Sequence, residues 1–402
     1  MHRDPNAVIA DTRKRQTLVS MLDQLCQQLD LTESQYETAR SRYESIGEWL
    51  AGGNSEFLQN AVIYAHGSIG LGTANKPIGR NEFDVDLVCH LPEIGPSASA
   101  AAVKTLIGER LREHGKYASM LEEKPRCWRI NYANEFHLDI TPSIVNPQCP
   151  KGGELVPDKK LSSWKATNPE GYKLRFQSYA ELCPRFYVRE ALAFDEAYKA
   201  DIEPFPEQSM SKPLLKRIVQ ILKRHRDHAF SSPARQGLAP ISIIITTLAA
   251  WSYADCVKKR SYADVFELIV DVIARMPDFI RVSKYNGRKT YTVENETTVG
   301  ENFAEKWNQD EQLAIAFYSW QKNVLSSITS LLQIDGLDAV GRHLGESFGV
   351  SQERVKQAVG PIANSISASR ASGLLYVAPT VGIVSTHAYG GVAVRQNTFF
   401  GR

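Results

Sequence analysis

The chain lacks the long apolar runs, metal-type cysteine spacings and secretion signal that mark several protein classes. Its longest apolar candidate, residues 239–251, is shorter than the roughly 20 residues that a membrane-spanning helix needs. The polar stretch MHRDPNAVIADTRKRQ has no apolar signal core, so we expect a cytoplasmic protein without a membrane partner. The six cysteines show no zinc-ligand spacing, which favours small buried side chains.

An excess of charge of one sign is also missing. The formal net charge is only +2 over 402 residues, whereas proteins that work along DNA or RNA usually carry a basic excess. This argues against a long nucleic acid as partner, while a local basic patch for a small anion stays open. The length allows two compact domains or one large bilobal unit.

The hydrophobic pattern divides the chain into a mixed first half and a helical second half. The first half predicts helices at 7–30, 32–53 and 97–115, strands at 60–67 and 82–91, and a hairpin at 125–145. Thr32 and Gln35 form a capping box. We expect the hairpin to turn near Ala133-Asn134 and its second strand to weaken at Pro142. A mixed sheet covered by helices is an α+β fold.

From about residue 205 the period becomes helical. The expected helices are 211–230, 239–258, 261–276, 302–333, 335–348 and 351–370, with a short hairpin or loop at 277–300. The last part is rich in glycine, valine and threonine and has no helical period, which predicts an extended, mobile tail.

Two aspartates stand two residues apart in the strand EFDVDLV. Because side chains alternate along a strand, Asp84 and Asp86 point to one face, while Phe83, Val85 and Leu87 point into a core. Two neighbouring carboxylates repel, and this raises their proton affinity unless a cation neutralises them. Oxygen ligands of this kind suit Mg²⁺.

A third carboxylate lies in FHLDITPS. Alternation puts His137, Asp139 and Thr141 on one face, so Asp139 joins the other two aspartates if this strand lies beside residues 82–91. Three carboxylates can hold two metal ions about 4 Å apart, which stabilises the attacking and leaving oxygens of phosphoryl transfer. We therefore expect two Mg²⁺ ions, with Mn²⁺ as a substitute, and we treat His137 as a supporting residue.

A Gly67-Ser68 turn precedes the acidic strand. Its backbone N–H groups and the Ser68 hydroxyl are suited to hold terminal phosphates. The stretch GSIGLGT lacks the Lys-Ser/Thr of a Walker loop and does not match the dinucleotide-binding glycine pattern. For His66, which precedes the turn, a substrate contact and a plain strand-end position are equally open.

Together, HGSIGLGT, FDVDLV and HLDITP resemble the DNA polymerase β-type nucleotidyltransferase superfamily. Within it the chain resembles the branch of oligoadenylate synthases and cyclic GMP-AMP synthases, and in its plan the bacterial CD-NTases (DncV-like enzymes). The resemblance implies a polymerase β-like core, a mixed sheet with helices, plus an all-helical C-terminal lobe across a cleft. The implied units are 1–205 (N-terminal helical spine and core), 206–375 (helical lobe) and 376–402 (tail).

The resemblance also implies triphosphate contacts outside the sheet. In the family, a lysine on the helix that corresponds to 211–230 and a serine that opens the next helix contact the triphosphate. The matching residues are Lys223, or Lys216 on the same stripe, and Ser242. Taken alone, a basic helix face is more typical of a solvated surface.

The implied reaction is nucleotidyl transfer with Asp84, Asp86 and Asp139 as catalytic and metal-binding residues. The implied substrates are nucleoside triphosphates (ATP, GTP or both), and the product is a cyclic di- or trinucleotide second messenger that a downstream effector reads in antiphage signalling. The alternatives are a linear oligoadenylate synthase, an RNA or protein nucleotidyltransferase of the same fold, and a non-enzymatic nucleotide-binding module, against which the three acids argue. Base choice, linkage and ring size stay open.

The end VAVRQNTFFGR is similar to the C-termini of some bacterial relatives, which end near glycine and are conjugated to targets by a ubiquitin-transfer-like partner. Here Arg402 follows Gly401, so a plain disordered end is the competing interpretation.

Overall fold

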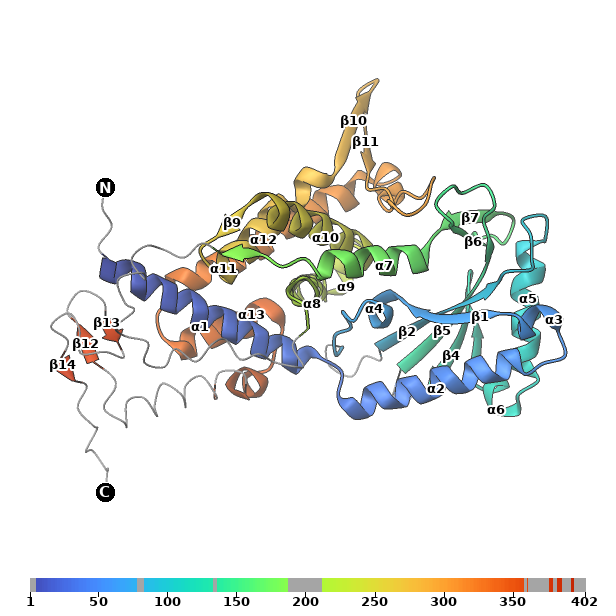
Figure 1. The fold of residues 1–402 in the computed structure, drawn as a ribbon, viewed down its shortest axis with the longest axis horizontal. Coiled ribbons are helices and arrows are strands. Elements are labelled where there is room, and N and C mark those ends of the chain that lie inside the picture. Colours follow the sequence, from blue (N-terminus) through green and yellow to red (C-terminus); the bar gives the residue numbers. More distant parts are fainter. Residues whose placement is uncertain are drawn as a thin grey trace.

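A seven-stranded mixed sheet forms the centre of the first half of the chain (Figure 1). The computed structural model describes residues 5–77, 83–132, 136–186, 212–357 and 360, and the short stretches 376–378, 382–384 and 392–393. The strand order is β1-β2-β5-β4-β3, with β6 paired to β5 and β7 to β6. The bounds are β1 Val62–His66, β2 Phe83–Leu91, β3 Leu121–Glu123, β4 Trp128–Tyr132, β5 Phe136–Val145, β6 Glu154–Pro157 and β7 Trp164–Thr167.

The central strands β2 and β5 run parallel, and β1 and β4 flank them in antiparallel pairing. The predicted strands and hairpin are confirmed, although the predicted turn lies outside the described residues. The expectation that Pro142 weakens the second strand is wrong, because β5 continues to Val145. Pro142 lies after the pairing with β4 ends at Ile140 and before the pairing with β6 begins at Ile144. Pro142 thus has no partner strand on this side, where a missing N–H is tolerated, although β2 pairs with it on the other side.

The first hydrophobic core lies between this sheet and two helices, α2 (Glu33–Ala51) and α5 (Ala100–Arg112). The inward residues of β2 and β5 that the alternation predicts are buried here. The capping box at the start of α2 is confirmed, since the Thr32 and Gln35 side chains each accept the other residue's backbone N–H. Short helices also belong to this half: α3 Glu56–Gln59, α4 Gly67–Gly70 and α6 Gly115–Ala118.

A second core is built mainly from helices of the second half (Figure 1). These are α8 Leu214–Ala229, α10 Ser242–Lys259, α11 Val265–Arg275, α12 Glu311–Thr329 and α13 Leu337–Phe348, with the short α9 Pro233–Gln236. The expected helix at 302–333 begins only at Glu311, because the side chains of Asn302 and Asn308 bond the backbone of Val293 and Tyr291 instead. The expected hairpin is β10 (Arg281–Tyr285) with β11 (Arg288–Thr292), which projects from the helices.

Helices α1 (Pro5–Leu29) and α7 (Pro169–Ala180) bury their apolar faces in this second core. The two cores therefore do not follow the predicted division of the chain at 205/206, a point that lies outside the described residues. The division itself stays a prediction. In the predicted tail, the described residues form three short antiparallel strands, β12 Tyr376–Ala378, β13 Gly382–Val384 and β14 Val392–Ala393. In the described part of the chain no helix is both long and apolar enough to cross a membrane.

Candidate active site

The three predicted carboxylates come together on neighbouring strands. In the parallel register of β2 and β5, Asp86 lies directly opposite Asp139, and Asp84 lies opposite His137. The Asp84 side chain is 56% exposed and that of Asp139 is 16% exposed. The acids thus share one face of the sheet, while Val85 and Leu87 are buried on the other.

Burial and the nearby acids shift the proton affinity of Asp84 and Asp86. Burial raises the pKa of Asp86, and repulsion from Asp139 and Asp84 adds to the rise. Desolvation is also the main cause that raises the pKa of Asp84, and Asp139 contributes. Carboxylates in this condition gain stability from a cation placed between them.

A cation that sequence reasoning missed is Arg129 of β4, directly opposite Asp139 in the antiparallel register. Its Nε donates to Asp139 Oδ1 at 2.6 Å and its Nη2 to Asp139 Oδ2 at 2.8 Å, while Nη2 also donates to Asp84 Oδ1 at 3.2 Å. The ion pair with Asp139 raises the pKa of Arg129. In a hairpin centred on residue 134, residues 129 and 139 are equally far from the turn and therefore lie opposite each other. The pair could thus have been predicted from the position of the turn.

The donor set fits a hard divalent cation. Among the described residues no group of three acidic, histidine or cysteine side chains stands arranged as a metal site, and Arg129 instead bridges two of the acids. The ligands that Asp84, Asp86 and Asp139 offer are all oxygens, and the Arg129 guanidinium contacts two of these three carboxylates. Such a set suits Mg²⁺ better than a soft metal.

The predicted glycine-serine turn lies against the acids. The register of β1 and β2 places His66 opposite Asp86, and Gly67 follows with a φ of +60°. A Cβ at Gly67 would overlap Asp86 Oδ2 and lie 2.9 Å from Asp86 Cγ, so only glycine fits. The Ser68 carbonyl accepts the Thr73 N–H at 2.9 Å, which closes the turn. The buried His66 Nε2 makes no hydrogen bond.

A cavity of about 850 Å³ opens beside this turn. Residues of both halves line it, including His66, Gly67, Trp164, Ile241, Ile243 and Phe303. Five basic side chains (Arg126, Lys159, Lys165, Lys173, Lys306) and two acidic ones (Glu301, Glu305) also line it, so the wall is net basic. This charge favours an anionic ligand. A cleft between two lobes remains a prediction.

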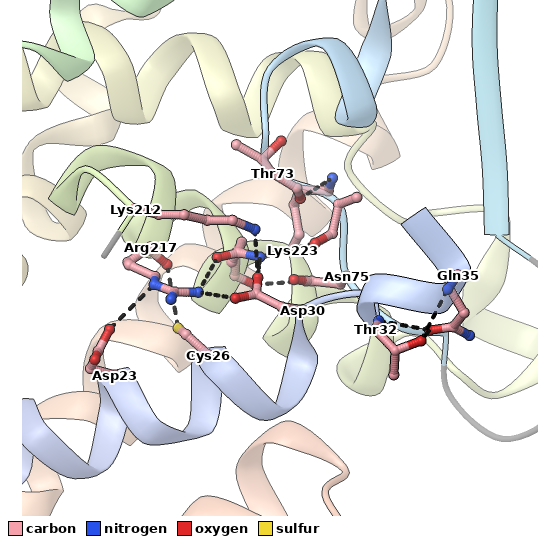
Figure 2. A network of polar contacts seen from close by, with 12 residues as sticks. Asp23, Cys26, Asp30, Thr32, Gln35, Thr73, Asn75, Lys212, Arg217 and Lys223 are labelled. Atoms are coloured by element: carbon pink, nitrogen blue, oxygen red, sulfur yellow. Dashed lines mark hydrogen bonds and ion pairs between the residues drawn. The ribbon is translucent and has the colours of Figure 1, made fainter. Parts of the chain in front are cut away.

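The predicted triphosphate lysines, Lys216 and Lys223, contact the segment that follows the Gly67-Ser68 turn. Lys223 is only 6% exposed, and its Nζ donates to the Thr73 carbonyl at 3.0 Å. Gln220 donates to the Ala74 carbonyl at 2.9 Å and to Asp30 at 2.8 Å. Figure 2 shows this network, in which α8 joins the end of α1 to the segment that follows the turn.

Arg217, Lys223 and Arg224 of the basic α8 face are buried and Lys216 is half-buried, which argues against the solvated-surface alternative. Burial lowers the pKa of Lys223 to about 8 and also lowers that of Lys216, whose Nζ lies over Gly72. Ser242 opens α10, and its Oγ accepts a hydrogen bond from Arg226 Nη2 at 3.1 Å. Ile241 and Ile243, the neighbours of Ser242, line the cavity. Lys216, Lys223 and Ser242 are not among the described residues that line it. Their contact with a triphosphate stays a prediction.

Comparison with known proteins agrees with this architecture. Residues 17–178 match the family described as the Second Messenger Oligonucleotide or Dinucleotide Synthetase domain. The chain is 28% identical over 396 residues to a c-di-GMP synthase of Roseivirga ehrenbergii, covering 98% of each chain. It is 26% identical over 249 residues to the cyclic dinucleotide synthase CdnG of Bradyrhizobium diazoefficiens, covering 57% of each.

Solved structures share the fold. The CD-NTase CdnG of Bradyrhizobium diazoefficiens in complex with GTP superposes with a TM-score of 0.61 at 18% identity, over 86% of this chain and 99% of that one. CdnC of Escherichia coli MS115-1 with ATP gives 0.56 at 11% identity, over 83% and 97%. The predicted core, a mixed sheet with helices followed by a mainly helical C-terminal part, is confirmed. The predicted resemblance to the bacterial CD-NTases is confirmed by the synthetase domain at residues 17–178 and by these relatives and structures.

Proposed function

We propose that this chain is a nucleotidyltransferase that joins nucleoside triphosphates into a cyclic dinucleotide and releases pyrophosphate. The observation that carries the proposal is the meeting of Asp84, Asp86 and Asp139 beside the Gly67 turn, which itself lines a basic cavity. The c-di-GMP synthase that aligns along 98% of the chain supports a dinucleotide product over a trinucleotide.

The chain's own groups suit each part of this reaction. The N–H groups of Gly67 and Ser68 and the basic cavity wall would hold the triphosphate, with Lys216, Lys223 and Ser242 supporting it. The acceptor hydroxyl oxygen attacks the α-phosphorus, and the bond to the pyrophosphate oxygen breaks. The hydroxyl proton passes to a carboxylate oxygen of Asp139. Catalysis then rests mainly on positioning and electrostatics.

Asp84, Asp86 and Asp139 are the side chains that would hold divalent cations. We propose two Mg²⁺ ions, for which Mn²⁺ can substitute. When bound, such ions neutralise phosphate charge and lower the pKa of the attacking hydroxyl. The all-oxygen donor set supports this choice.

The test is incubation with ATP, GTP, CTP, UTP and Mg²⁺, followed by phosphatase treatment and mass spectrometry. Wild type should release pyrophosphate and form a phosphatase-resistant cyclic dinucleotide, and Asp84→Asn with Asp86→Asn should abolish both. Asp335→Asn is the matched control, because that carboxylate is 97% exposed on the helical half. Product formation that survives the double change would refute the carboxylate site.

The same assay separates the alternatives. Phosphatase-sensitive linear adenylates would identify a linear oligoadenylate synthase, and label on added RNA or on a protein band would identify an RNA or protein nucleotidyltransferase. Nucleotide binding that does not depend on Mg²⁺, without formation of any product, would identify a non-enzymatic binding module.

We further propose that the product is a second messenger in antiphage defence, read by a downstream effector. Family membership supports this proposal, and the test is phage challenge of cells with the wild-type chain or the double aspartate variant. The proposed units are 1–205, 206–375 and a tail, 376–402. Conjugation of the tail by a ubiquitin-transfer-like partner remains a prediction, since Gly401 and Arg402 lie outside the described residues.

A further inference from the structure

Arg129 occupies a position between two sets of acids. On one side it bonds both oxygens of Asp139 and one of Asp84. On its other side lies Glu122 of β3, which is directly opposite Arg129 in the antiparallel register of β3 and β4. Glu122 is 46% exposed and accepts hydrogen bonds from Lys124 at 2.5 Å and Asn131 at 3.4 Å.

We propose that Arg129 is a built-in counterion of the catalytic carboxylates, which pairs with Asp139 and Asp84 in the metal-free chain and moves to Glu122 when a divalent cation binds. Arg129 is thereby a positioning residue that sets the metal affinity of the site. The inference rests on the proposed function, because it concerns the same three acids.

The exchange follows from charge and geometry. The cation would need the Asp139 and Asp84 oxygens that Arg129 now holds, and a guanidinium left at that place would repel it. Arginine keeps its proton in proteins, so only a movement of the side chain can free the acids. The Arg129 side chain is 21% exposed and therefore borders solvent.

Glu122 makes such a movement local. Residues directly opposite on neighbouring strands have their Cβ atoms about 4.5–5.5 Å apart, within reach of an arginine side chain on either side. Glu122 and Asp139 both stand opposite Arg129, one on each neighbouring strand. A rotation about the Arg129 side-chain torsions changes the partner without a change in the sheet.

The test measures Mg²⁺ binding to the nucleotide-free, metal-stripped chain by calorimetry and by the Mg²⁺ dependence of its thermal unfolding. Arg129→Gln should lower the apparent Kd for Mg²⁺ at least tenfold and lower the unfolding midpoint without metal. Glu122→Gln should raise the apparent Kd several-fold, because it removes the second partner. In the Arg129→Gln background, Glu122→Gln should have no further effect. Arg40→Gln, which breaks an exposed ion pair with Glu44, controls for the loss of charge.

Unchanged or weaker Mg²⁺ binding by Arg129→Gln overturns the proposal. An unchanged Kd in Glu122→Gln overturns the movement to β3, and this exposed variant decides the question even if Arg129→Gln fails to fold. If the wild-type chain forms product and binds Mg²⁺, but the variants bind Mg²⁺ with the same affinity, only the proposed role of Arg129 is refuted and the proposed function stands. A wild-type chain that does not respond to Mg²⁺ would refute the metal site of the proposed function as well.

Discussion

Replacement of Gly67 by alanine tests how closely the turn must approach the acids. Alanine at a φ of +60° costs about 1 kcal/mol of folding free energy relative to glycine. Its Cβ would also overlap Asp86 Oδ2 and lie 2.9 Å from Cγ, so the carboxylate must leave its present position beside Asp139 and Asp84. A displacement of about 1 Å at a reacting group lowers turnover roughly 100-fold. We expect that loss in pyrophosphate release, with only about 1–2 kcal/mol lost in urea unfolding.

The matched control is Gly152→Ala. Gly152 has a similar φ of +72°, but a Cβ there meets nothing within 4 Å. It should lose the same folding free energy and keep its turnover. The argument from contact with Asp86 would be refuted if the turnover of Gly67→Ala stayed within threefold of wild type, or if both variants lost turnover equally.

Three further predictions concern the second core and the network of Figure 2. Burial lowers the pKa of His225 to about 4, and its Nδ1 accepts the Trp320 indole N–H. Between pH 6.5 and 4 this histidine is therefore protonated in the unfolded chain but not in the folded chain, so the folded state loses stability as the pH is lowered. This group should make wild type about 2 kcal/mol less stable at pH 5 than at pH 7.5. Urea unfolding of His225→Gln should lack this component, and an identical pH dependence would contradict it. Lys223→Met should keep stability within about 2 kcal/mol, because the lost desolvation penalty offsets the unpaired Thr73 carbonyl. Its turnover should fall as the turn loosens, and wild-type turnover would show that this contact is dispensable. Asp30→Asn should destabilise the chain by about 2 kcal/mol in urea unfolding, because Lys212 and the buried Arg217 lose a charged partner and Arg217 keeps only its ion pair with Asp23. A change below about 0.5 kcal/mol would argue that the network contributes little.

Local patterns determined much of the fold and the identity of the acids. Thr32 and Gln35 are three residues apart, so their capping box depends on nothing distant. Alternation in EFDVDLV put Asp84 and Asp86 on one face because the period of a strand is a property of the backbone. These rules identified β1, β2, the β4–β5 hairpin, most of the long helices and the carboxylates, while β3, β6, β7 and α7 were not predicted.

Only the tertiary structure decided what those residues meet. The parallel pairing of β2 and β5 sets Asp139 beside Asp86, and the hairpin register brings Arg129 to them. The burial of Lys223 depends on the loop that packs against α8, and α1 joined the helical core although its sequence neighbours cover the sheet. Periodicity tells which face of an element is apolar, because that is local. It does not tell which surface will cover that face, because many partners bury similar area, and the choice depends on contacts between residues far apart in the chain.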